Sequence, residues 1–167
     1  MKKGKWLMLT VFAGLILAAG PAISQGTNRG NSHSGSNRGE IISEVSPREL
    51  ERIMEDEGYN VDVNRDGSIQ WTMEIGRGEF SALIFISDDN ESIQFWTYFT
   101  SDQTSLRDVN RWNQKRRFSR SYLDDDNDPI LEMDKDLEGG VTRENLVNFF
   151  DLCEASFIAW GIELTSH

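Results

Sequence analysis

The middle of the chain constrains the fold most, because four strand-length segments follow one another with only short turns between them. These segments are residues 59–63, 69–75, 80–86 and 93–99. Residues 64–67, Asn-Arg-Asp-Gly, are a hairpin signal, and residues 76–78 and 88–91 are also turn sequences. Consecutive strands joined by short turns pair as an antiparallel meander.

Two of these segments are apolar on both faces. Side chains alternate along a strand, so Leu83 and Phe85 lie opposite their apolar neighbours in residues 80–86, as do Trp96 and Tyr98 in residues 93–99. An antiparallel sheet with one face in water is polar on that face. We therefore expect a cover for these four side chains, which a helix, a second copy of the domain or a client segment could supply. Trp and Tyr are common at binding hot spots, so the four are the candidate partner-binding residues.

Helices are expected on both sides of the meander. Ser46, Pro47 and Glu49 predict a helix start, with Ser46 as N-cap and Glu49 closing a capping box, and Gly58 ends this helix. A second helix begins near Thr104 or Ser105 and ends in a basic cluster.

A hairpin and a third helix complete the predicted order. Residues 118–123 and 130–137 form the hairpin, Gly139 and Gly140 break the chain, and Thr142 caps a helix that runs to about Trp160. Helix, four strands, helix, two strands and helix predict an α+β layered domain with helices packed on an antiparallel sheet.

The N-terminus predicts export. Lys2, Lys3 and Lys5 precede an apolar run at residues 6–19, and the small residues Ala22 and Ser24 suit cleavage after Ser24. The run is too short for a membrane-spanning helix, so we expect no stable anchor after cleavage. Residues 1–24 are the predicted signal peptide, residues 25–40 a disordered Gly/Ser/Asn linker, and residues 41–167 the folded domain. The expected location is the periplasm, with release outside the cell as the alternative.

The charge balance excludes one class of partner. The chain carries a formal net charge of −11, and removal of residues 1–24 takes away three lysines and no acid, which leaves −14. Such a chain repels nucleic acid and anionic membrane surfaces. We therefore expect no nucleic-acid partner.

The single cysteine, Cys153, forms no intrachain disulfide. It shares the helical spacing of Leu146, Phe150 and Phe157, which places it on an apolar helix face. We expect it to be buried and inert rather than catalytic.

Two acidic segments are candidate calcium sites. Residues 62–67 resemble the first half of a calcium loop, but Met73 stands where the bidentate glutamate is required, and a hairpin turn explains the residues better. The second segment contains Asp124, Asp126 and Asp128, which are weak calcium candidates. Aspartate is also an ordinary turn former, so a plain turn is the alternative.

The second predicted helix ends in a basic segment. Its candidate anion- or partner-binding residues are Arg111, Lys115, Arg116, Arg117 and Arg120. A plainer interpretation is that these cations complement a helix C-terminus and pair with neighbouring carboxylates.

The sequence contains no pattern typical of an enzyme. No Ser-His-Asp set, usable Cys-His pair, phosphate-binding glycine loop or zinc spacing is present, so we expect no catalytic residues and no cofactor.

Residues 109–122, Val-Asn-Arg-Trp-Asn-Gln-Lys-Arg-Arg-Phe-Ser-Arg-Ser-Tyr, resemble the signature of the YbjN family. Residues 126–134 and 136–142 continue the resemblance, which covers roughly residues 43–160. It implies a bacterial regulator of sensory transduction or stress response, a fold similar to type III secretion chaperones, and no agreed catalytic residues. The predicted signal peptide departs from the cytosolic role that the family name implies.

Two functions from different classes remain open. The first is an exported, non-enzymatic module that binds a protein or peptide, as a monomer or a homodimer. The second is an envelope ligand or ion sensor that uses the basic helix end or the acidic turn.

Overall fold

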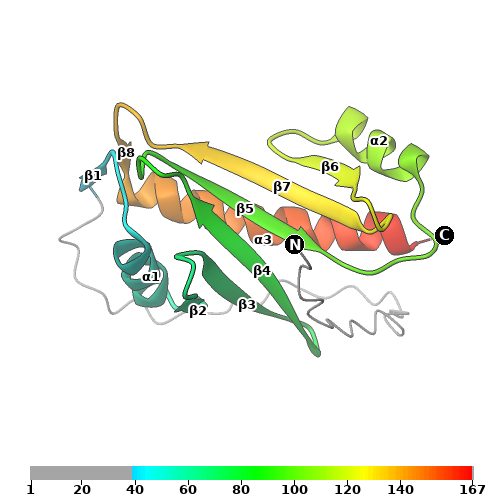
Figure 1. Ribbon diagram of the computed structural model, residues 1–167, viewed down its shortest axis with the longest axis horizontal. Coiled ribbons are helices and arrows are strands. Elements are labelled where there is room, and N and C mark those ends of the chain that lie inside the picture. Colours follow the sequence, from blue (N-terminus) through cyan, green and yellow to red (C-terminus); the bar gives the residue numbers. More distant parts are fainter. Residues whose placement is uncertain (1–38, 167) are drawn as a thin grey trace, which may run out of the picture.

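The computed structural model describes residues 39–166 (Figure 1). The predicted signal peptide and residues 25–38 of the predicted linker lie outside the described residues. The helices are α1 (Pro47–Asp56), α2 (Leu106–Lys115) and α3 (Arg143–Thr165). The strands are β1 (Ile41–Ile42), β2 (Asn60–Val63), β3 (Ile69–Ile75), β4 (Gly78–Ile86), β5 (Ser92–Tyr98), β6 (Arg120–Leu123), β7 (Pro129–Asp136) and β8 (Val141–Thr142).

Six strands form one antiparallel sheet in the order β2-β3-β4-β5-β7-β6. The predicted meander from β2 to β5 and the predicted β6–β7 hairpin are both confirmed. The chain leaves β5, passes through α2, and returns as the hairpin, whose second strand, β7, pairs with β5. The α+β order of elements derived from the sequence is therefore confirmed.

The long helix α3 covers one face of the sheet, behind the strands in Figure 1. Its aromatic side chains meet successive parts of that face: Phe150 contacts Trp71 with ring centroids 6.1 Å apart, and Phe157 contacts Phe80 at 5.4 Å. Trp160 contacts Phe99 at 4.9 Å. This face and α3 enclose most of the hydrophobic core.

The predicted helix caps are present. Ser46 and Glu49 form the capping box of α1 with Pro47 in the first turn, and the Thr142 hydroxyl accepts from the backbone N–H of Asn145 at the start of α3. These caps satisfy backbone donors that a helix start leaves free. Gly67 has a φ of 86°, which fits the predicted hairpin turn between β2 and β3.

Two features differ from the sequence expectations. Helix α3 continues past Trp160 to Thr165, and β1 pairs with β8 as a separate two-stranded sheet that was not predicted. Two-residue strands carry no readable alternation, so their pairing has no sequence signal. No helix within residues 39–166 is both long and apolar enough to cross a bilayer.

Both outer strands of the six-stranded sheet are short, and side chains form hydrogen bonds with backbone groups of these edge strands. On β6, Asn113 Oδ1 accepts from the Ser121 N–H and Asn113 Nδ2 donates to the Ser121 carbonyl, both at 2.8 Å. On β2, the carboxylate of Glu51 accepts from the Val63 N–H at 3.1 Å. Such contacts limit pairing of an edge strand with another chain.

Candidate functional site

The second face of the sheet brings the predicted partner-binding residues together. The register places Leu83 opposite Trp96, Trp96 opposite Glu132, and Glu132 opposite Arg120. Paired residues point to the same side, so this row crosses β4, β5, β7 and β6 on one face. Tyr98, Ile130 and Tyr122 form the next row across β5, β7 and β6.

The aromatic rings of this face contact one another. Phe85 meets Trp96 edge to face with centroids 6.4 Å apart, and Trp96 meets Tyr98 at 5.2 Å. Phe85 and Tyr122 are each 38% exposed, while Leu83, Trp96 and Tyr98 are half-buried. We name these five residues the aromatic face.

No helix of residues 39–166 buries the aromatic face. Helix α3 lies on the opposite side of the sheet, and no helix lies in front of β4 and β5 in Figure 1. Helix α2 packs mainly against β6 and α3, and α1 packs mainly against β2, with Arg143 of α3 paired to Asp56 at its end. Monomeric proteins seldom expose clustered aromatic side chains without a use for them.

A buried carboxylate supports the aromatic face from β7. Glu132 is only 6% exposed, accepts from the Tyr122 hydroxyl at 2.6 Å and pairs with Arg120. Burial, then the hydrogen bond to Glu132, raises the pKa of the Tyr122 hydroxyl, which therefore stays a donor. The same carboxylate, as a hydrogen-bond acceptor, raises the pKa of the Arg120 guanidinium. Sequence reasoning missed Tyr122 and Glu132, although strand alternation in the β6–β7 hairpin could have placed both on one face.

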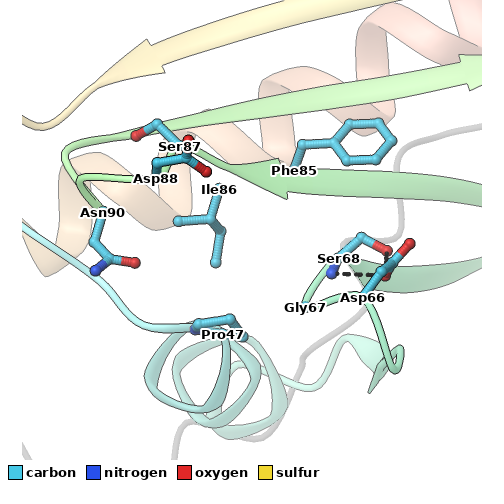
Figure 2. Close-up of a pocket in the computed structure, with 9 residues that line it drawn as sticks. All are labelled: Pro47, Asp66, Gly67, Ser68, Phe85, Ile86, Ser87, Asp88 and Asn90. Carbon is cyan, nitrogen blue, oxygen red and sulfur yellow. Dashed lines mark hydrogen bonds between the residues drawn. The ribbon is translucent and has the colours of Figure 1, made fainter.

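A hollow of about 240 Å³ continues the face beyond Phe85. Figure 2 shows the β2–β3 turn, the β4–β5 turn and the start of α1 around it. Its lining residues are Pro47, Asp66, Gly67, Ser68, Phe85, Ile86, Ser87, Asp88 and Asn90. The Asp66 carboxylate accepts from the hydroxyl and the backbone N–H of Ser68, and these bonds hold its pKa below the usual range.

The basic segment is largely neutralised within the fold. Arg111 pairs with Asp108, Lys115 and Arg116 pair with Glu163, and Arg120 pairs with Glu132 and Asp134. Arg116 also lies over the Trp112 ring, and Arg117 over the Phe118 ring. The structure thus favours the plainer interpretation of pairing with carboxylates.

The acidic turn between β6 and β7 uses its carboxylates for backbone hydrogen bonds. Asp124 Oδ1 accepts from the N–H groups of Asp126 and Asp128, both at 2.9 Å, and Asp128 accepts from the Ser101 N–H. Within residues 39–166, no group of three or more Asp, Glu, His or Cys side chains converges as metal ligands would. The structure therefore does not bring the calcium candidates Asp124, Asp126 and Asp128 together as a ligand set.

The predicted burial of Cys153 is confirmed, and Trp112 is buried as well. Cys153 is fully buried, and burial raises the pKa of its thiol well above the usual value. Trp112 is 1% exposed and its ring nitrogen donates to the Ser119 hydroxyl at 3.1 Å. Both side chains belong to the core and not to a surface site.

The comparisons with known proteins agree with this architecture. The YbjN family, described as "Putative bacterial sensory transduction regulator", matches residues 46–160. A solved structure, "Crystal structure of YbjN, a putative transcription regulator from E. coli", aligns with a TM-score of 0.61 and 17% sequence identity. The alignment covers 76% of this chain and 95% of the E. coli chain. A comparison with curated proteins found no match. Since the family match spans more than half of the sequence, the chain belongs to the YbjN family.

Proposed function

We propose that this protein is an exported, non-enzymatic regulatory module of the bacterial envelope, and that it acts by binding a protein or peptide through the aromatic face. The observation that carries the proposal is the contact cluster of Phe85, Trp96 and Tyr98 on a sheet face that the domain's own helices leave open. Aromatic residues of this kind supply much of the free energy of protein recognition.

The family description supports a regulatory role in general terms. The E. coli protein of known structure is described as "a putative transcription regulator". For the present chain, the formal net charge of −11 argues against direct contact with DNA. Regulation through a protein or peptide partner fits the charge better.

The ligand-sensor alternative has weaker support. Four of its five basic candidates, Arg111, Lys115, Arg116 and Arg120, already face carboxylates of the same domain. An anionic ligand would have to displace those carboxylates, which costs free energy on binding.

Site-specific photo-crosslinking in intact cells tests the proposal. A benzoylphenylalanine placed at Phe85 puts the crosslinker on the aromatic face, and one placed at Phe118 puts it on an exposed ring beside the basic segment. We expect a discrete adduct from position 85 and none from position 118. The reverse result would favour the basic segment and contradict the proposal.

Cell fractionation tests the export part. The mature chain is expected in the envelope fraction, and its intact mass should match a chain that begins at or near Gln25. A full-length chain confined to the cytosol would contradict export.

A further inference from the structure

The strands that form the aromatic face also carry an excess of carboxylates on the same side. By the pairing register within residues 39–166, these are Asp62, Glu74, Glu79, Glu132, Asp134 and Asp136. Arg120 is the one cation that the described strands present on this face, and it already pairs with Glu132 and Asp134. The surroundings of the aromatic rings are therefore strongly negative.

We propose that the partner of the aromatic face is a basic, extended peptide segment in which Arg or Lys alternates with apolar residues. This inference rests on the proposed function and names the chemistry of its partner. Apolar side chains would pack on Leu83, Trp96 and Tyr98, and the cationic groups would face the surrounding carboxylates. Cations also bind the faces of Trp and Tyr rings favourably.

The hollow beside Phe85 suits one such cationic side chain. In the proposed complex, the apolar stem of a Lys or Arg would pack against Phe85 while its charged head would lie toward Asp66; Asp88 lines the opposite side of the hollow. The carboxylate of Asp66 is held in place by two hydrogen bonds from Ser68, so it presents a fixed negative charge. Guanidinium groups match carboxylates well because both are planar.

Charge also excludes other occupants of this face. A second copy of the domain would place two acidic faces against each other, and like charges in contact disfavour association. Nucleic acid and anionic lipid are repelled for the same reason. A basic peptide gains from the same field, which also speeds its association at low salt.

Three matched peptides test the inference in the mature protein. Each has ten residues, with Arg, Gln or Glu alternating with Val, and binding is measured by fluorescence anisotropy. We expect the Arg peptide to bind at least about tenfold more tightly than the Gln peptide, and the Glu peptide to bind most weakly. Added salt should weaken binding of the Arg peptide. The Phe85→Ala substitution should weaken binding of the Arg peptide by about tenfold as well.

A pair of variants separates the site from the net charge of the protein. Glu79→Gln with Asp88→Asn removes two carboxylates at the face and the hollow, whereas Glu55→Gln with Glu138→Gln removes two exposed carboxylates elsewhere. Only the first pair should weaken the Arg peptide by more than about threefold. Equal loss in both pairs would show attraction to the whole protein and would overturn the inference.

The remaining outcomes are distinguishable. Equal affinity for the Arg and Gln peptides, lost in Phe85→Ala, would overturn the basic preference and leave the proposed function standing. Failure of the Arg peptide to bind at about 1 mM would also overturn the inference of a basic partner, while crosslinking at position 85 decides the proposed function separately.

The chain's own N-terminal segment is a candidate competitor for the face, because residues 25–38 contain Arg29 and Arg38 and no acid. If Arg29→Gln with Arg38→Gln tightens binding of the uncharged Gln peptide as much as that of the Arg peptide, the chain's own segment competes for the face and the proposal of a separate partner is wrong.

Discussion

Asn113 offers a sharp test of how the sheet edge is held, because one amide side chain satisfies both backbone groups of Ser121. Its oxygen accepts from the Ser121 N–H and its nitrogen donates to the Ser121 carbonyl, each at 2.8 Å. Ser121 is 3% exposed beneath the exposed Asn113 side chain, so these two bonds lie at the margin of the core. Asn113→Ala removes both.

The expected loss follows from the two bonds. Each contributes about 0.5–1.5 kcal/mol, so the free energy of unfolding should fall by about 1–3 kcal/mol. Alanine has a higher helix propensity than asparagine by roughly 0.5 kcal/mol, and this difference offsets part of the loss. The net destabilisation should be about 0.5–2.5 kcal/mol, or a melting temperature lower by about 2–12 °C for a domain of this size.

Urea denaturation and amide hydrogen exchange measure the two consequences. Gln114→Ala is the matched control, since it removes an amide from the next, exposed position of α2. It should change stability by less than about 0.5 kcal/mol. Asn113→Ala should also speed exchange of the Ser121 amide, whereas the control should not. Equal stability of the two variants would refute the argument that Asn113 secures β6.

Three further predictions concern single side chains. Cys153 should react slowly with a thiol reagent in the native protein and rapidly in denaturant, because it is fully buried; rapid native labelling would contradict this. Trp112→Ala should cost about 3–5 kcal/mol in thermal or chemical denaturation, and unchanged stability with loss of partner capture would instead make Trp112 a binding residue. Burial, reinforced by Asp124 and other nearby acids, raises the pKa of Asp128, so its ionisation opposes folding as the pH rises through that pKa. Asp128→Asn, which can still accept from the Ser101 N–H, should therefore raise the melting temperature at pH 7 but not below about pH 3, and equal effects at both pH values would contradict the assignment.

Local sequence signals predicted most of the fold. The capping box of Ser46 and Glu49 and the Thr142 cap depend on residues within one helical turn, so the sequence alone reveals them. The burial of Cys153 followed from the spacing of apolar residues on one helix. The two-sided apolar character of β4 and β5 followed from side-chain alternation.

Contacts between distant residues were not predictable from local patterns. In the sequence, the basic segment looks like a patch of unpaired cations. Its carboxylate partners Glu163, Glu132 and Asp134 come from later in the chain. The acidic setting of the aromatic face likewise depends on the register of β7 against β5. Alternation shows which face a side chain occupies, but not which strand lies beside it.

The pairing of β1 with β8 has a consequence for the order of folding. The strands from β2 to β5 pair with sequence neighbours, so each hairpin can form as soon as its own residues are available. Strand β1 must wait for β8, and the Arg143 N–H that donates to the Glu40 carbonyl comes later still. In a chain that is synthesised or translocated from its N-terminus, the first strand of the domain is therefore among the last to dock. Until β8 has formed, β1 is an unpaired strand outside the six-stranded sheet, so a pull applied to it would not open that sheet.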